Sequence, residues 1–407
     1  MSIQILKIKN IPIKLHFTLI FIFVFLSWTL SSGFMPHYYP NLTRTEYVVM
    51  GISGAIILFV SVLIHELAHS ILSTKYGVKV NQIILFIFGG ISDIKEETRD
   101  FRKEFKIAVI GPLTSFGLGG IFLSIFLLIT FISSERTEAE TYLQVLKGVL
   151  LYGFIVNILL GAFNLLPAFP MDGGRMLRAA LVRWLDYQRA TKISVQVGII
   201  ISFVLIGLGI VVIIRSSPIG GLWLILIGWF IQSGAKAYLQ QFELSNLLKD
   251  LRLKDIMNTS FVSVKPDLSI RNLISNYFDV HRKGSFPVID DNSVLLGMVS
   301  TYDILNKGES FFEKKTMDIM QPISNLIVMK SDMQVNNALE QLVRKRMNRI
   351  FVVDDDFKLI GIVSKTDILN AAQERADYDE ILKYTRKSRR FMEGSNTKIN
   401  KIDSDAT

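Results

Sequence analysis

Residues 56–70 read IILFVSVLIHELAHS, and this stretch carries the strongest information in the chain. An apolar run interrupted only by Ser61 leads directly into His65, Glu66 and His69. The run belongs to a longer apolar segment, about 48–75, and a membrane-spanning helix needs roughly 20 such residues. Ionisable side chains are expensive inside a membrane helix and indicate a functional site. The stretch therefore predicts a membrane helix that carries chemistry.

The spacing of the three polar residues indicates a metal site. Residues four apart share one face of a helix, so the imidazoles of His65 and His69 can reach one ion. Glu66 then projects near a water molecule held by that ion. The alternative interpretation is a polar contact between neighbouring helices. The chain has no cysteine, so any metal must be held by His, Asp or Glu.

A catalytic zinc takes a third protein ligand and leaves a fourth position for water. The remaining histidines are poorly placed for this: His16, His37 and His281. The best carboxylate is Asp172, within NLLPAFPMDGGR at 164–175. Two prolines and two glycines break the helix there, which lets the carboxylate turn inward. As an alternative, Asp172 only caps a helix that begins at Gly173.

Composition and hydropathy divide the chain into a membrane part and a water-soluble part. Half of the 407 residues are hydrophobic and the mean hydropathy is +0.38, too high for one ordinary soluble chain. A short apolar stretch, 83–91, cannot span a bilayer and is predicted to be a strand or a re-entrant hairpin. The membrane domain is expected to cover residues 1–242, with six helices at about 15–35, 48–75, 105–132, 144–166, 192–214 and 219–240.

The distribution of basic residues predicts the orientation. The formal charge is +9, and Lys and Arg gather before the first predicted span and in the second and fourth links between spans. Cytoplasmic loops of membrane proteins carry this excess, so both termini are expected in the cytoplasm of a cell membrane. The same explanation makes a nucleic-acid partner unnecessary. The residues concerned are Lys7, Lys9, Lys14, the segment 75–106, Arg175, Arg178, Arg183, Arg189 and Lys192.

After Phe242 the composition changes to that of a soluble α/β domain, and an internal repeat appears. FPVID at 286–290 and GMVSTYDIL at 297–305 match IFVVD at 350–354 and GIVSKTDIL at 361–369, with a constant offset of 64 residues. The two copies are expected at 253–308 and 316–372. The charged segment 376–407 is predicted to be a disordered tail.

These motifs together resemble the site-2 protease family of intramembrane metalloproteases. The family's helix motif matches His65, Glu66 and His69, and its Asn-x-x-Pro-x-x-x-x-Asp-Gly motif matches Asn164 and Asp172, together with Pro167 and Gly173. The resemblance implies one zinc ion held by both histidines and Asp172, with Glu66 as general base on the zinc-bound water. It further implies that Asn164 orients the substrate or stabilises the oxyanion. Asn164 could equally hydrogen-bond between helices.

The repeated module resembles tandem cystathionine-β-synthase (CBS) domains, many of which bind adenine nucleotides between the repeats. The resemblance implies ribose contacts from Ser300 and Asp303 and from Ser364 and Asp367. A module that only forms a homodimer is the alternative. The expected fold is a polytopic α-helical membrane domain of about six helices with a short strand or re-entrant element, followed by an α/β tandem CBS module.

The function implied by the resemblance is hydrolysis of peptide bonds in or near transmembrane segments of membrane proteins, within the lipid bilayer. Single-span proteins are the expected substrates. The chief alternative is a CBS-gated transporter or channel for a divalent metal, with the same His, Glu and Asp residues as a permeation site. Another membrane zinc protease type takes a downstream Glu as third ligand, but no Glu lies between Glu140 and Glu243.

Overall fold

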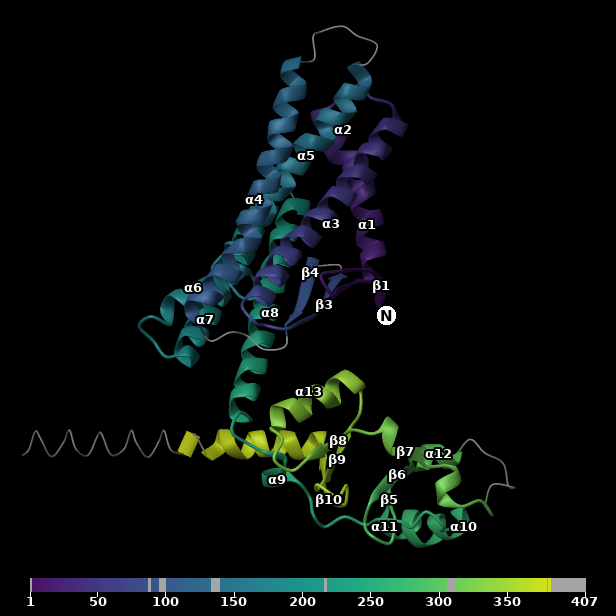
Figure 1. Cartoon of the computed structure of the whole chain (residues 1–407). Coiled ribbons are helices and arrows are strands. Elements are labelled where there is room, and N and C mark those ends of the chain that lie inside the picture. Colours follow the sequence, from purple (N-terminus) through teal and green to yellow (C-terminus); the bar gives the residue numbers. More distant parts are fainter. Residues whose placement is uncertain are drawn as a thin grey trace, which may run out of the picture. The chain divides into compact units, whose positions relative to one another are not determined.

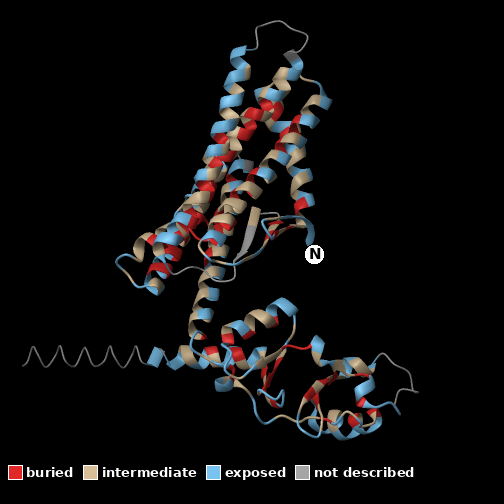
Figure 2. Cartoon of the chain, viewed as in Figure 1, coloured by how far each residue is buried: buried red, intermediate tan, exposed pale blue. Residues whose placement is uncertain are grey.

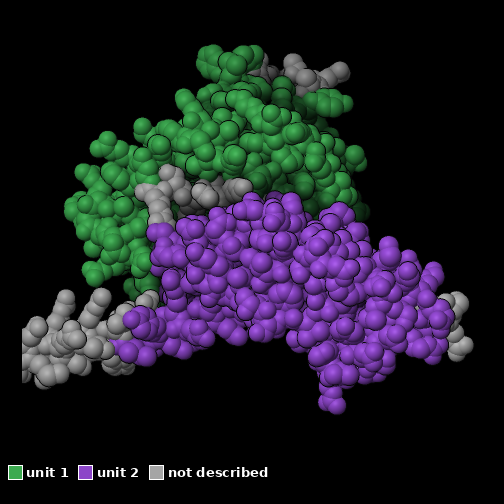
Figure 3. All heavy atoms as spheres, turned by 60° about the horizontal axis from the view of Figure 1, so that its bottom comes forward, with its two compact units in different colours: residues 1–240 green, residues 241–407 purple. Residues whose placement is uncertain are grey.

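The structure is a computed structural model that describes residues 2–86, 89–94, 100–132, 140–215, 218–305, 312–378 and 380–381. It consists of two compact units, residues 1–240 and 241–407, which Figure 3 colours separately. Most of the segment predicted to be a disordered tail, and Phe88 beside the predicted hairpin, lie outside the described residues.

In the described chain, six helical segments are long and apolar enough to cross a membrane, which confirms the predicted number. The first is built from α1 (Thr18–Thr29), a π-helical turn (Leu30–Phe34) and α2 (Met35–Tyr38). The others are α3 (Arg44–Lys75), α4 (Phe101–Ile132), α5 (Glu140–Asn164), α7 (Tyr187–Arg215) and α8 (Pro218–Leu247), all labelled in Figure 1.

The long helices expose apolar side chains. Phe131 of α4 is 91% exposed and Ile214 of α7 is 78% exposed, and Figure 2 shows exposed residues recurring along the outer faces of the bundle. Water would penalise such surfaces, whereas lipid does not. These helices therefore have the surface of membrane helices, and their buried faces carry small and polar residues such as Ser61, Ser115 and Asn157.

A four-stranded sheet accompanies the helices of the first unit. Its order is β1 (Ser2–Ile8), β2 (Ile11–His16), β3 (Val80–Phe86) and β4 (Gly89–Ile94). The β2–β3 pair is parallel and the outer pairs are antiparallel. The predicted strand at 83–91 is thus confirmed as part of a hairpin, whereas β1 and β2 were not predicted. The first predicted helix began at about residue 15, so it overlapped only the end of β2, and no element was predicted over the rest of the two strands.

The second unit contains two similar three-stranded sheets. The first is β5 (Ser285–Ile289), β6 (Leu295–Ser300) and β7 (Gln321–Pro322), and the second is β10 (Leu359–Ser364), β9 (Arg349–Val353) and β8 (Val328–Lys330). Residues 365–378 are also helical. The other helices are α9 (Leu253–Ile256), α10 (Ile270–Leu273), α11 (Asp279–His281), α12 (Thr301–Leu305) and α13 (Val335–Lys345), with a π-helical turn (Ile274–Phe278) and two 3₁₀ turns (Thr316–Asp318, Ile323–Asn325).

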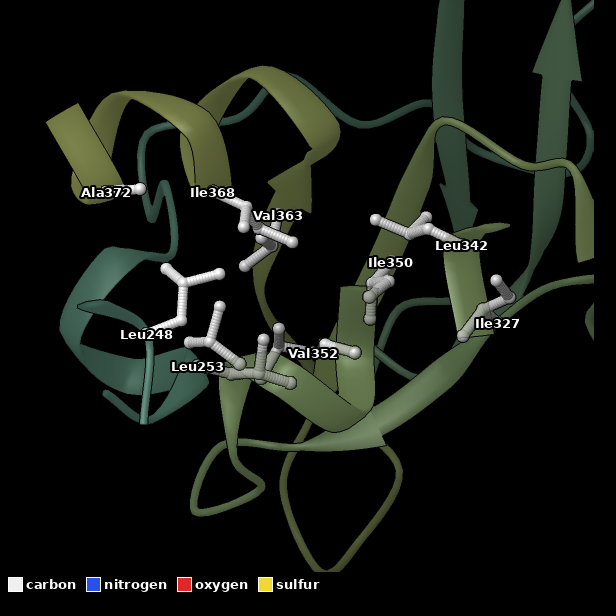
Figure 4. Packing of buried hydrophobic residues seen from close by; sticks show 11 residues of the cluster. Leu248, Leu253, Ile327, Leu342, Ile350, Val352, Val363, Ile368 and Ala372 are labelled. Atoms are coloured by element: carbon white, nitrogen blue, oxygen red, sulfur yellow. The ribbon is translucent and has the colours of Figure 1, made fainter. Parts of the chain in front are cut away.

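The two repeats exchange their leading segments. Leu253, at the start of the first repeat, packs in the core of the second with Val352 and Val363 (Figure 4). In return, β7 of the second repeat pairs with β6 of the first. Each repeat therefore contributes a segment to the core or the sheet of the other.

Candidate metal centre

Three side chains from two distant parts of the sequence converge in the first unit. His65 and His69 lie one turn apart on α3, and Asp172 is the first residue of the short helix α6 (Asp172–Leu181). Oδ2 of Asp172 lies 3.2 Å from Nε2 of His65 and 3.0 Å from Nε2 of His69, and the two Nε2 atoms are 3.2 Å apart. The exposed fractions are 3%, 4% and 9%. Among the described residues, this is the group of ligand types close enough to hold one metal ion.

The other ring nitrogens of the two histidines are occupied by α4. Nδ1 of His69 lies 2.6 Å from the backbone carbonyl of Ile107, and Nδ1 of His65 lies 2.9 Å from the hydroxyl of Ser115. A carbonyl only accepts, so Nδ1 of His69 carries the proton and leaves the lone pair of Nε2 for a metal. Ser115, which can also accept, supports the same tautomer of His65.

These two partners were not predicted from the sequence. The Ile107 contact comes from the main chain, which every residue shares, so no side-chain pattern could indicate it. Ser115 is a small polar residue in an apolar helix and is fully buried. Ser115 lies eight residues after Ile107, so both can face the same neighbouring helix. This spacing indicates a histidine partner only once α3 is known to pack beside α4.

Gly111 allows α4 to approach the histidines closely. A Cβ at this position would lie within 3.0 Å of Nε2 of both His65 and His69. Any side chain there would enter the space between the ligand atoms. The glycine is therefore required by the centre itself rather than by the conformation of the helix.

Asp172 does not cap the helix that it begins. The N-cap residue is Met171, without a side-chain cap hydrogen bond, so the structure contradicts the capping alternative. Burial raises the pKa of the Asp172 carboxyl, but the charges and hydrogen bonds of His69 and His65 outweigh burial and hold that pKa well below its usual range. A carboxyl group binds a metal ion in its ionised form.

Glu66 lies beside the sheet rather than among the converging ligand atoms. A Cβ on Gly90 of β4 would lie within 3.0 Å of Cγ of Glu66, so this side chain packs against the bare backbone of the strand. Asn164 is the last residue of α5, where its Nδ2 donates to the carbonyl of Leu160 at 2.9 Å. The predicted metal ligands are therefore brought together, and the two predicted catalytic residues lie outside that group.

The four residues predicted to contact a nucleotide form two matching pairs in the second unit. The hydroxyl and backbone N–H of Ser300 both donate to Oδ2 of Asp303, and those of Ser364 donate to Oδ2 of Asp367, at 2.6–2.8 Å. In the first pair only, the structure also gives a 3.4 Å contact from Nε2 of Gln321 to Oδ1 of Asp303. Each pair begins the helix that follows a strand, so a cap of that helix is part of its role.

Known protein families match both units of the chain. The model of "Peptidase family M50" matches residues 53–205, and that of "CBS domain" matches 253–309 and 317–374. "Zinc metalloprotease MJ0392" of Methanocaldococcus jannaschii is 31% identical over 371 residues, which cover 91% of this chain and 96% of the relative. The chain belongs to peptidase family M50, the site-2 proteases. "Putative zinc metalloprotease Rip3" of Mycobacterium tuberculosis is 28% identical, covering 90% of this chain and 92% of Rip3.

A solved structure of "Site-2 Protease from Methanocaldococcus jannaschii" is 31% identical and covers 59% of this chain and 95% of its own, with a TM-score of 0.41. This chain is therefore a multi-pass membrane metalloprotease with a tandem CBS module. Membership of the family implies zinc and membrane-protein substrates. Membership of this family favours the protease over the metal transporter that was the chief alternative. Two imidazoles and one carboxylate are the kind of ligand set that a catalytic zinc site uses, in which the fourth position belongs to water.

Proposed function

We propose that this site-2 protease hydrolyses peptide bonds in or near transmembrane segments, with His65, His69 and Asp172 as zinc ligands and Glu66 as general base. One observation carries the proposal. Nε2 of both histidines and Oδ2 of Asp172 lie within 3.2 Å of one another, buried at the face of a helix long enough to span a membrane. Three ionisable side chains in such a setting are expensive unless they act together.

Each group at the site has a separate role in the proposed hydrolysis. When bound, zinc supplies Lewis acidity, which activates a water molecule and polarises the peptide carbonyl. Glu66 accepts the proton of the attacking water and then delivers it to the leaving amine. Ser115 and the Ile107 carbonyl hold the imidazoles in orientation through Nδ1. Burial of the site between α3, α4 and α6 restricts access of bulk water.

The substrate is proposed to unwind and to pair as a strand with β4. A peptide in a helix has its backbone groups hydrogen-bonded, and an edge strand offers unpaired N–H and C=O groups in exchange. β4 is an edge of the sheet in the described chain, and Glu66 packs against its Gly90. A substrate strand added there would therefore run beside the proposed base.

Proline scanning of β4 tests this pairing. Successive N–H groups of an edge strand alternate between the neighbouring strand and the free edge, so Ile91→Pro and Ser92→Pro remove one group of each kind. The variant that loses the outward N–H should keep its zinc and its fold but cleave poorly. Full cleavage by both variants would eliminate strand pairing as the mode of substrate binding.

Asn164 is proposed to orient the substrate or stabilise the oxyanion. Its amide has two N–H groups, of which one donates to Leu160 within α5. The second can serve a substrate carbonyl, and Asn164→Ala should then lower kcat while zinc binding is unchanged. If Asn164 only hydrogen-bonds between helices, the substitution should lower stability and leave kcat of the folded protein intact.

The CBS module is proposed to regulate the protease through an adenine nucleotide. In the first repeat, Gln321 already contacts Asp303, so a ribose would compete with that amide. We therefore expect the pair Ser364 and Asp367 to bind more tightly. Equilibrium dialysis of the full chain with labelled ATP, ADP and AMP, comparing Asp367→Ala with Asp303→Ala, tests this. No binding at millimolar nucleotide would leave the homodimer as the role of the module.

Both termini are proposed to be cytoplasmic. The natural absence of cysteine allows single-cysteine labelling without background. Lys9→Cys and Arg252→Cys should react with a membrane-impermeant maleimide only after the cells are opened, whereas Tyr142→Cys, in the first turns of α5, should react in intact cells. The reverse pattern would invert the orientation.

The central experiment measures cleavage of a tagged single-span reporter by purified protein, with zinc quantified in the same sample. Glu66→Gln keeps the side-chain shape but removes the base, so cleavage should fall by about 10²–10⁴-fold with one zinc per chain retained. Glu46→Gln on the same helix is the matched control, because Gln also serves in a capping box such as that of Thr43 and Glu46. Unchanged cleavage by Glu66→Gln would refute its role as base.

A further inference from the structure

Arg178 of α6 is the largest fully buried side chain of the described residues, with an exposed fraction of 0%. It lies six residues after Asp172 on the same short helix. A buried guanidinium is tolerated only when its charge and its N–H groups are matched. Its hydrogen-bond partners, Glu104 and Tyr238, are distant in the sequence.

The guanidinium is enclosed by one carboxylate and three aromatic rings. Nε donates to Oε1 of Glu104 at 2.7 Å, and Nη2 donates to the same oxygen. Nη1 donates to the hydroxyl of Tyr238 on α8. The cation also lies 5.2 Å from the ring centroid of Phe169, 4.9 Å from that of Tyr187 and 5.6 Å from that of Tyr238.

The two partners of the ion pair belong to the two elements that complete the metal centre around α3. Glu104 lies in the first turn of α4, three residues before Ile107, whose carbonyl holds Nδ1 of His69. Arg178 lies on the helix that begins with Asp172. The ion pair therefore joins the helix that orients the histidines to the helix that presents the carboxylate. α6 also packs closely through its buried Gly173, Gly174 and Ala179, and the ion pair adds a directed, charged link to α4.

We propose that Arg178 is a positioning residue of the metal centre: its fork to Glu104 and its hydrogen bond to Tyr238 hold α6 so that Asp172 stays within reach of both imidazoles. This rests on the proposed role of Asp172 as a zinc ligand. Arg is required because its planar fork makes several directed hydrogen bonds at once, whereas Lys presents a single compact charge on a flexible stem.

A residue that only anchored the fold would behave differently. It would lower the stability of the zinc-free and zinc-loaded proteins equally and leave the affinity for zinc unchanged. A positioning residue reduces the affinity and also the extra thermal stability that zinc confers, because binding to the folded state stabilises it in proportion to that affinity. The two roles are thus separable without measuring proteolysis.

The test uses the full chain in detergent with Arg178→Lys and Tyr238→Phe. Tyr238→Phe removes one hydroxyl and retains the ring that stacks on Phe169, with centroids 4.2 Å apart. This variant keeps the packing, so it tests the proposal even if Arg178→Lys does not fold. Arg189→Lys is the matched control, since Arg189 is 77% exposed and forms an ion pair with Asp186 at 3.2 Å. The readouts are the zinc dissociation constant, from competition with a chromophoric chelator, the visible spectrum after cobalt loading, and melting with and without zinc.

Arg178→Lys is expected to weaken zinc binding by about 10–100-fold, as changes to groups that orient metal ligands do, and to alter the cobalt spectrum. Tyr238→Phe should shift both in the same direction by less, and Arg189→Lys should match the wild type. Folded variants with wild-type zinc affinity and cobalt spectra would overturn the proposal. If the wild-type protein itself binds no zinc, the metal centre proposed above fails, which is a separate and recognisable result.

Discussion

Two buried clusters of ionisable side chains join α6 to neighbouring helices, one to α3 and one to α4, and they differ in how far the sequence reveals them. The metal cluster contains His65, His69 and Asp172, and the ion-pair cluster contains Arg178 and Glu104. Two of the proposed metal ligands lie four residues apart on one helix, so their relation is visible as a local pattern. The ion pair joins residues 74 positions apart, and Arg178 looked like one of several basic residues that predict orientation. Local spacing reveals chemistry; long-range pairing does not.

The largest expected effect comes from filling the space beside the metal cluster. Gly111→Ala places a Cβ within 3.0 Å of Nε2 of both histidines, so we expect zinc binding and cleavage to be lost. Gly117→Ala on the same helix is the control, because no atom lies within 4 Å of its added Cβ. Zinc content and reporter cleavage measure the difference, and equal behaviour of the two variants would contradict the close approach of α4.

The ion-pair cluster should respond through stability. Arg178→Met leaves Glu104 buried without its cation and is expected to lower the free energy of unfolding by about 3–5 kcal/mol. The double variant Glu104→Leu/Arg178→Met removes both charges and should recover most of that loss. Unfolding by SDS in mixed micelles measures both. A double variant less stable than Arg178→Met would show that the pair is not the unit that matters.

A smaller effect is expected from the hydroxyl that orients His65. Ser115→Ala removes the partner of Nδ1 and should weaken zinc binding by about 10–100-fold while the helix is retained. Ser124→Ala is the control on the same helix, because the Ser124 hydroxyl donates only to the carbonyl of Gly120. Chelator competition measures the zinc dissociation constant, and matching constants for the two variants would exclude an orienting role for Ser115.

The smallest effect is expected where an ion pair faces solvent. Arg189→Ala removes the exposed pair with Asp186 and should change the free energy of unfolding by only about 0–1 kcal/mol. The same SDS titration places this variant beside Arg178→Met. A comparable loss in both variants would mean that burial is not what makes the Arg178 cluster important.

The sequence alone predicts six membrane helices, a strand or re-entrant hairpin at 83–91, the repeated soluble module and the three side chains that converge in the first unit. Each is encoded in properties that act along the chain: apolar run length, side-chain spacing on a helix, and a constant repeat offset. β1 and β2 were not predicted, because alternation over six residues is ambiguous beside a longer apolar run.

The groups that support the proposed metal centre became visible only in the folded chain. The Ile107 carbonyl belongs to the main chain, and Gly111 matters because of what α3 places beside it. Arg and Glu are residue types that usually lie on the surface, and Arg178 and Glu104 become buried partners only when α4 and α6 pack together. The physical reason is that burial and pairing are properties of packed surfaces, which bring together residues that no local period connects.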